Sequence, residues 1–160
     1  MKTYKATGNK SLIVETIDAP TDASLVKVKI SQLMPTYLDI SHYKGTVKTT
    51  YPHSIGSVAI GIISDDRAEY GLKRGTKVII NPYETDMSDR LDLPGKVKTR
   101  GMELDGLFSD FVYLEVDKIT PFPEDVREEE AIFAEKIAIA RKPFVYQRIE
   151  CLRMETIALN

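Results

Sequence analysis

Apolar and polar side chains alternate most clearly along residues 24–34. One set of positions is apolar and the other polar: Val26, Val28 and Ile30 against Lys27, Lys29 and Ser31. Successive side chains of a β-strand point to opposite faces, so a period of two is typical of a strand with one buried face. The pattern therefore predicts a half-buried strand over residues 24–34.

Several more short runs rich in Ile, Val and Tyr occupy the first two-thirds of the chain. They predict further strands over residues 11–17, 58–64, 77–81 and 108–116. Turn-forming Gly, Pro and Asp separate them, at residues 18–20, 73–75 and 81–82. Many short strands with close turns predict a mainly β, antiparallel barrel or sandwich. Residues 84–107 are irregular and largely polar, which predicts a long lobe or loop.

The pattern changes after Pro123. Acidic residues at 124, 125 and 128–130 precede an Ala- and Ile-rich run over residues 131–140, and basic residues lie at its end. This charge distribution complements a helix dipole, so it predicts a helix over 131–140 and makes the acidic run a helix start rather than a metal site. Pro143 interrupts this helix, and a second short helix is predicted over residues 144–152.

Composition narrows the class of protein. The 160 residues suit one domain, and 42% apolar with 29% charged residues is typical of a soluble globular chain. A formal net charge of -2 gives no electrostatic case for nucleic acid or a membrane surface as partner. No apolar run approaches the roughly 18 residues of a membrane span, and no signal peptide is evident, so we expect a cytoplasmic protein. The single cysteine, Cys151, excludes an internal disulfide.

Five segments, in order, resemble one family. They are residues 30–39 (ISQLMPTYLD) with 44–45, residues 51–61 (YPHSIGSVAIG), residues 71–78 (GLKRGTKV), residues 105–112 (DGLFSDFV) and residues 134–140 (AEKIAIA). Together they are similar to the N-terminal, GroES-like domain of medium-chain dehydrogenases/reductases of the zinc-type alcohol dehydrogenase group. The resemblance covers nearly the whole chain and implies a GroES-like barrel followed by C-terminal helices.

The resemblance also shows which zinc ligands this sequence lacks. In the family a zinc ion polarises the oxygen of the alcohol or carbonyl while hydride passes to or from a nicotinamide. Thr36 stands where the family has its ligating Cys, Ser57 where it has His, and Val58 where it has Glu. Only Glu135 remains of the positions near the metal, and one carboxylate does not hold a catalytic zinc. Residues 81–101 lack the family's four-cysteine loop, so no zinc of either kind is expected.

The sequence does not include a complete Rossmann domain, which is the cofactor-binding domain of the family. The sequence contains no Gly-x-Gly-x-x-Gly, the fingerprint that lets the backbone approach a dinucleotide pyrophosphate. Residues 155–160 resemble only the opening strand of that domain, so the chain is expected to be truncated relative to the family. We therefore divide it into a GroES-like domain, residues 1–140, and a helix with the stub of a cofactor domain, residues 141–160. No cofactor is expected in this chain, and NAD(P) only if a partner chain supplies that domain.

The sequence leaves two interpretations open for three candidate pocket residues, Thr36, Asp39 and Glu135. Thr36 either binds a substrate hydroxyl or is a loop residue, and Asp39 either serves the pocket or caps a short helical turn. Ser57 and Val58 are expected to fill the vacated metal pocket by packing. Glu135 is either a partly buried carboxylate with a raised pKa or a surface residue. The two histidines, His42 and His53, are expected on the surface or in loops.

Three functions remain open on the sequence alone. The chain is a zinc-free remnant with a binding or assembly role, or one half of a split oxidoreductase whose partner supplies the cofactor domain, or a truncated product of such an enzyme. In the family, the helix at residues 137–149 packs between the two halves of the enzyme. Its apolar side needs a cover, so we expect either a homo-oligomer or a complex with a cofactor-domain partner chain.

Overall fold

A five-stranded antiparallel sheet forms the centre of the molecule. The structure, a computed structural model, describes residues 1–85, 97–138 and 140–141. The strand order is β10-β6-β5-β3-β9. The strands are β3 (Val26–Leu33), β5 (Ala59–Ile63), β6 (Lys77–Ile80), β9 (Phe111–Leu114) and β10 (Ile119–Pro121). A register shift between Ile30 and Gln32 bends β3 against β5, which helps the sheet to curve.

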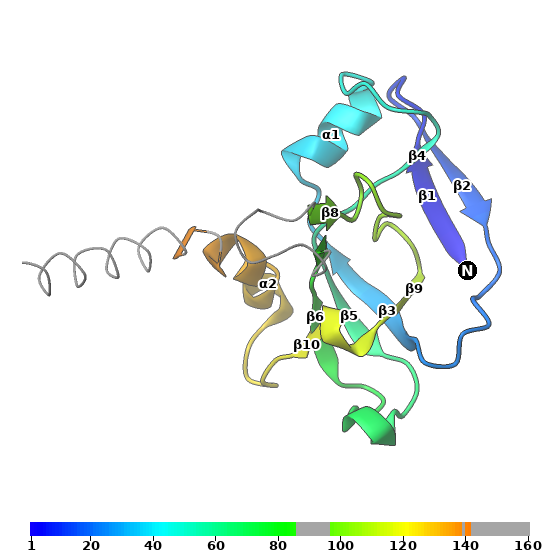
Figure 1. Ribbon diagram of the computed structural model, residues 1–160. Helices are drawn as coiled ribbons and strands as arrows, with labels where there is room; N and C mark the ends of the chain where they lie inside the picture. Colours follow the sequence, from blue (N-terminus) through cyan, green and yellow to red (C-terminus); the bar gives the residue numbers. More distant parts are fainter. Residues whose placement is uncertain (86–96, 139, 142–160) are drawn as a thin grey trace, which may run out of the picture.

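A smaller sheet closes one side of the curve. Its order is β2-β1-β4, with β1 (Lys2–Ala6), β2 (Leu12–Thr16) and β4 (His53–Ser54). The segment before β9 joins the two sheets, because the Tyr4 N–H donates to the Phe108 carbonyl at 2.8 Å and the Asp110 N–H to the Lys2 carbonyl at 3.0 Å. The two sheets together form a curled half-barrel, with β1 and β2 on its right-hand side in Figure 1.

Both faces of β5 are buried, which explains its almost continuous apolar sequence. Ala59 and Ile63 point into the barrel interior, together with Val26 and Val28 of β3 and Leu114 of β9. The intervening side chains point the other way. On that outer face Val58 and Ile60 form a second cluster with Ala131 and Ile132 from the C-terminal helical region. The outer cluster therefore attaches the helical region to the sheet.

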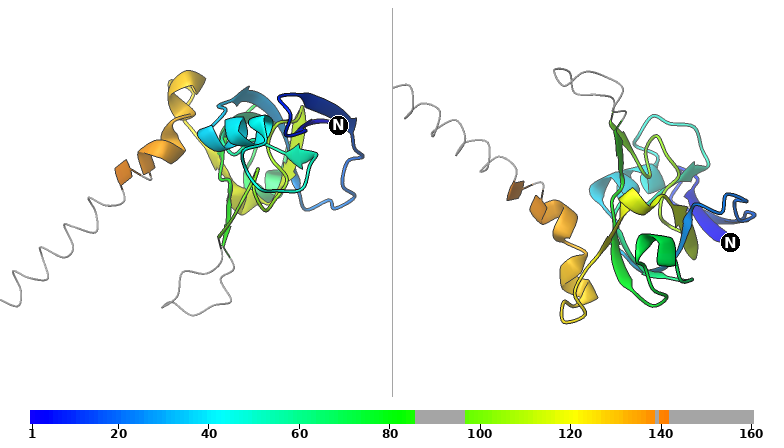
Figure 2. Two further views of the ribbon diagram at one scale, coloured as in Figure 1. Left: turned by 90° about the horizontal axis from the view of Figure 1, so that it is seen from above. Right: turned by 60° about the horizontal axis from the view of Figure 1, so that its bottom comes forward.

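The described residues also form two helices and two short 3-10 turns. The helices are α1 (Tyr37–Lys44) and α2 (Glu128–Ala131), and the turns are η1 (Ala68–Tyr70) and η2 (Val116–Lys118). The left-handed Gly45, at φ 74°, ends α1. Beyond α2, a turn at residues 132–133 is followed by helical residues 134–138, which extend away from the barrel in both views of Figure 2. No helix in the described ranges is long and apolar enough to cross a membrane.

The predicted mainly β barrel with C-terminal helices is confirmed, and each strand predicted by alternation is present with shorter ends. Strands β1, β4 and β10 were not predicted. In β1 the buried positions are Thr3 and Ala6, which are too small or too polar to give an apolar pattern. The lobe or loop predicted over residues 84–107 contains a short antiparallel ladder that was not predicted, in which β7 (Tyr83–Thr85) pairs with β8 (Val97–Thr99).

The predicted C-terminal helix begins earlier than expected and is interrupted. Three acidic residues, Glu128, Glu129 and Glu130, form the first turn of α2 rather than preceding it, because carboxylates are favoured inside the first turn. The helix predicted over residues 144–152 lies outside the described residues, as does the predicted stub at residues 141–160 apart from residue 141.

Candidate functional site

Two segments far apart in the sequence lie side by side next to α1. The Met34 N–H donates to the Val58 carbonyl at 3.1 Å, and the Gly56 N–H donates to Asp39 Oδ1 at 2.7 Å. The structure thereby brings together four of the five candidate residues, Thr36, Asp39, Ser57 and Val58. Their spacing in the sequence, about twenty positions, gives no indication of this contact by itself.

A buried carboxylate organises the start of α1. Thr36 is the N-cap residue, and Asp39 Oδ2 accepts from the Thr36 backbone N–H and from its hydroxyl, both at 2.7 Å. The Asp39 N–H donates back to Thr36 Oγ1 at 3.4 Å, which completes a capping box. Asp39 is only 3% exposed. The Thr36 hydroxyl hydrogen is thus used within the helix cap.

Gly56 gives the same carboxylate its third donor. The residue has φ 101°, and a Cβ placed on it would lie 2.6 Å from Cδ2 of the Phe108 ring. Only glycine tolerates this conformation and this close approach. The chain can therefore turn its N–H toward Asp39 Oδ1 immediately before Ser57.

Ser57 and Val58 follow Gly56 directly along the chain. Ser57 is 9% exposed and Val58 is 4% exposed. The Val58 side chain packs in the outer apolar cluster with Ile60, Ala131 and Ile132. Val58 is thus a packing residue, with its isopropyl group in contact with the helical region.

Glu135 lies in a different contact, with a residue that the sequence did not single out. The Tyr83 hydroxyl donates to Glu135 Oε1 at 2.5 Å. The carboxylate is 11% exposed, and Lys136 Nζ lies 2.7 Å from the buried Oε2 without hydrogen-bond geometry. Burial, the hydrogen bond to Glu135 and its negative charge together raise the pKa of Tyr83 to about 12. Tyr83 lies between the predicted turn at residues 81–82 and the predicted loop at residues 84–107, so no local pattern marked it.

His42 is buried, so its predicted surface or loop position is wrong. It is 2% exposed on α1, and its ring stacks on that of His53 with centroids 4.2 Å apart and an interplanar angle of 21°. Neither ring nitrogen of His42 has a hydrogen-bond partner among the described residues, whereas His53 Nε2 donates to the Gly101 carbonyl at 3.0 Å. The spacing of three from Asp39 could have indicated this burial, because residues three apart share a helix face.

The environment of His42 disfavours its charged form. Burial lowers the pKa of the His42 imidazole below its ordinary value of 6.5, the neighbouring His53 lowers it further, and Asp39 partly offsets both. The neutral ring is therefore the form that the fold accommodates.

Comparison with known proteins identifies the family of this arrangement. Residues 21–124 match the family model described as alcohol dehydrogenase GroES-like domain. The chain belongs to this family. The comparison with curated proteins gave no match.

Solved structures share the fold of this GroES-like domain at low sequence identity. Galactitol-1-phosphate dehydrogenase from Escherichia coli matches with a TM-score of 0.67 and 19% identity, over 83% of this chain and 41% of its own. For 2R,3R-butanediol dehydrogenase from Bacillus subtilis the values are 0.65, 18%, 82% and 43%. An alcohol dehydrogenase from the archaeon Aeropyrum pernix gives 0.63, 23%, 82% and 42%. The chain thus spans about two-fifths of the length of these structures.

The residues of this GroES-like domain do not fit the zinc ion of the zinc-type enzymes. Zinc is held by thiolate, imidazole or carboxylate groups. At the positions that the sequence resemblance matches to the zinc ligands, the chain carries two hydroxyls and an isopropyl group, in Thr36, Ser57 and Val58, and the nearby Asp39 already accepts three hydrogen bonds. Within the described ranges, no group of three or more His, Cys, Asp or Glu is placed to hold a metal ion.

Replacing Asp39 tests the importance of the cap. In Asp39→Asn an amide NH₂ replaces one acceptor oxygen and meets a buried N–H or O–H donor. We expect the free energy of unfolding to fall by about 1–3 kcal/mol, measured by chemical denaturation. Asp65→Asn removes the same charge from an exposed position and should change it by less than about 0.5 kcal/mol. Equal stability of the two variants would contradict the proposed importance of the cap.

His42 should make the fold sensitive to mild acid. Its pKa is lower in the folded than in the unfolded chain, so protons bind preferentially to the unfolded state as the pH falls below 6.5. The stability from the neutral ring is complete above that pH and declines below it. Denaturation midpoints between about pH 7.5 and 5.5 should fall less steeply for His42→Leu than for the wild type. Parallel pH profiles of the two proteins would refute this expectation.

Proposed function

We propose that this GroES-like domain is a zinc-free relative of alcohol dehydrogenases that binds a ligand or partner and does not catalyse hydride transfer by itself. One observation carries the proposal. The positions that match the zinc ligands of the family are used structurally, with the Thr36 hydroxyl bonded to Asp39 and Val58 packed among Ile60, Ala131 and Ile132.

The cofactor side of the argument comes from the sequence. Hydride transfer to or from an alcohol or carbonyl requires a bound hydride carrier such as a nicotinamide. The sequence contains no Gly-x-Gly-x-x-Gly, the loop with which a Rossmann domain receives the pyrophosphate of a dinucleotide. Turnover would therefore need a cofactor domain outside these 160 residues.

Zinc content tests the ligand-loss argument. Elemental analysis of the dialysed wild-type protein should show well under one zinc per chain. The double variant Thr36→Cys/Ser57→His and the triple variant with Val58→Glu restore two and three donors, and three protein ligands are typical of a catalytic zinc. We expect zinc retention to rise from wild type to triple variant, with circular dichroism confirming that each variant is folded.

A full zinc equivalent in dialysed wild type would overturn the proposal, whatever the variants do. If a buried carboxylate at position 58 prevents folding of the triple variant, the double variant still tests zinc binding, because it keeps the apolar contact of Val58. Wild-type protein that oxidises simple alcohols with added NAD or NADP would also overturn it.

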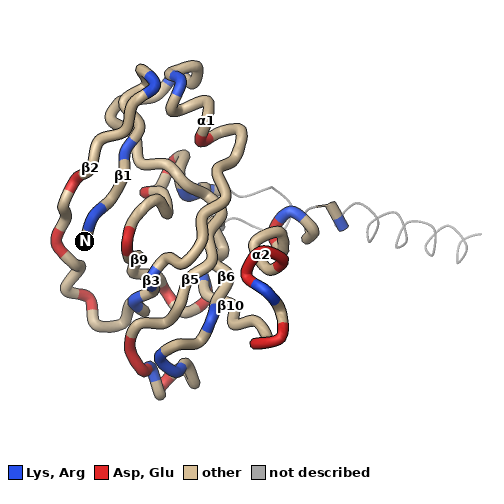
Figure 3. The backbone as a smooth tube through the Cα atoms, turned by 180° about the vertical axis from the view of Figure 1, so that it is seen from behind, with Lys and Arg blue, Asp and Glu red and all other residues tan. Residues whose placement is uncertain are grey.

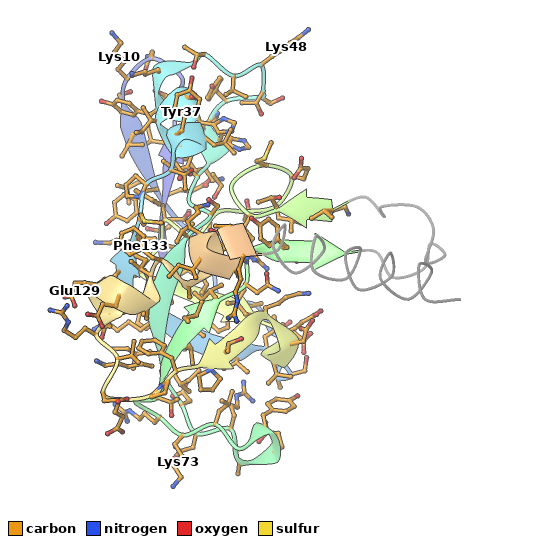
Figure 4. The ribbon with its side chains drawn as sticks, turned by 90° about the vertical axis from the view of Figure 1, so that its left-hand side faces the viewer. Lys10, Tyr37, Lys48, Lys73, Glu129 and Phe133 are labelled. Carbon is orange, nitrogen blue, oxygen red and sulfur yellow. The ribbon has the colours of Figure 1, made fainter. Side chains whose placement is uncertain are left out.

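One feature of the surface favours a second function, the substrate-side half of a split oxidoreductase. Phe133 is 50% exposed and Ile137 is 61% exposed. The Ile137 N–H donates to the Phe133 carbonyl at 2.9 Å, so the two side chains lie one helical turn apart on the same face. Figure 4 views the molecule from this side and labels Phe133 at the helical region. A cofactor-domain chain that covers this face would place its nicotinamide near the barrel.

Native mass spectrometry of the protein isolated gently from its source cells distinguishes the two functions. The split-enzyme function predicts a stable complex of the 18.0 kDa chain with a second chain that carries a nicotinamide cofactor. Phe133→Glu/Ile137→Glu should abolish this complex, whereas Val97→Glu, at an equally exposed apolar position elsewhere, should leave it intact. Detection of the 18.0 kDa chain alone or with copies of itself would eliminate the split-enzyme function.

A further inference from the structure

Within the described part of the chain, strand β2 forms an open and apolar sheet edge. It is the outer strand in the order β2-β1-β4, and the ribbon shows it at the margin of the molecule (Figure 1). All five of its residues are exposed, including three consecutive apolar side chains: Leu12 at 44%, Ile13 at 42% and Val14 at 56%. Consecutive exposed apolar residues on an edge strand are unusual without a function, because such an edge can template pairing with another chain.

The hydrogen bonds to β1 determine which backbone groups of β2 face outward. The Thr7 N–H donates to the Ser11 carbonyl at 3.1 Å, and the Ile17 N–H donates to the Met1 carbonyl at 2.9 Å. Because hydrogen-bonded pairs alternate along an antiparallel ladder, residues 11, 13, 15 and 17 direct their N–H and C=O groups to β1. Residues 12, 14 and 16 direct theirs to the open edge.

This edge lacks the usual protection against pairing. Natural edge strands are commonly blocked by a lysine, a proline, a bulge or an inward-pointing charge. Residues 11–17 contain no lysine or proline, and their single charge, on Glu15, is 2.5 Å from Lys5 of the neighbouring strand. A second strand could therefore add to β2 without burying an unpaired charge.

We propose that a second copy of this chain pairs with β2 in antiparallel orientation about a two-fold axis at Val14. In this register Val14 faces Val14 of the other copy, and Leu12 faces Thr16. In this register residues 12, 14 and 16, whose backbone groups face outward, pair only with one another. A register centred on residue 13 or 15 would pair one of them with a residue beyond the ends of β2. The apolar side chains at 12 and 14 continue across the junction on one face of a six-stranded sheet.

Charge at the two ends of the strand supports a copy as the occupant. Lys10 is exposed at one end of β2 and projects from the tip of the hairpin in Figure 4, while Asp18 is exposed beyond the other end. Figure 3 shows acidic positions along β2 and in the segment that follows it. Antiparallel pairing with a copy brings the basic end of each strand to the acidic end of the other, twice by symmetry. The pairing does not depend on the pocket chemistry proposed above.

Oxidative cross-linking tests both the surface and the register. In a Cys151→Ser background, Val14→Cys places two thiols opposite each other on the two-fold axis, at a Cα separation of about 5.5 Å. That distance lies within the range of roughly 4.4–6.8 Å that a disulfide spans. Ile13→Cys is the matched control. In the proposed register residue 13 of one copy is offset by two positions from residue 13 of the other, so the two thiols are too far apart to form a disulfide. We expect a disulfide-linked species of twice the 18.0 kDa chain mass only for Val14→Cys.

Sedimentation velocity supplies a second and independent measurement. The N–H of Val14 faces the open edge, so Val14→Pro removes it without breaking the ladder to β1. Val14→Thr keeps that N–H and the branched shape. At micromolar concentrations we expect dimers for wild type and Val14→Thr, and monomers for Val14→Pro.

Several outcomes would overturn the proposal. Equal cross-linking of the two cysteine variants would mean random collision or another register, and absence of cross-linking in both would mean another occupant or none. A wild-type monomer, or a Val14→Pro dimer as stable as the wild type, would locate any association elsewhere.

Discussion

The carboxylate of Asp39 is the group on which the surroundings of the candidate pocket depend. It is 3% exposed and accepts hydrogen bonds from the Thr36 backbone, the Thr36 hydroxyl and the Gly56 backbone. A buried charge is tolerated only when its acceptors are satisfied, so α1 and the segment at residues 56–58 must keep their positions together. One side chain thus caps the helix and fixes the loop that carries the candidate pocket residues.

The same constraint gives α1 an unusual polarity. The helix buries Asp39, Ser41 and His42 and exposes Tyr37, at 86%, and Ile40, at 43%. Globular helices generally bury their apolar side, so the inward polar face is better explained by the capping network than by hydrophobic burial. Around the start of α1 this domain has hydroxyl–carboxylate bonds between Thr36 and Asp39, and the Val58 side chain packs in the outer apolar cluster.

The two surfaces proposed above for association differ in chemistry. The face with Phe133 and Ile137 offers side chains alone, so a partner would bind it by shape and apolar contact. Strand β2 offers unpaired backbone groups in a fixed register, so a partner would have to be an extended strand. The first suits a folded domain of another chain, and the second suits a copy of the same strand.

The sequence by itself determined the mainly β architecture, and it alone gives the expectation that the metal donors are lost. Alternation at Val26, Val28 and Ile30 identified a strand because local periodicity records which side of an element is buried. The identities of Thr36, Ser57 and Val58 are the basis of the expectation that no zinc is bound, since donor chemistry belongs to the side chain. Strand β1 buries Thr3 and Ala6 and has no comparable apolar periodicity, so it was not predicted.

Only the tertiary structure decided the contacts between distant segments. The bond between Tyr83 and Glu135, the stacking of His42 on His53 and the Gly56 donor to Asp39 join residues separated by 52, 11 and 17 positions. Such pairs depend on strand register and on how the barrel closes, which no local pattern encodes. The outward direction of the backbone at Val14 likewise follows from its pairing with β1, because the same sequence shifted by one residue would turn those groups inward.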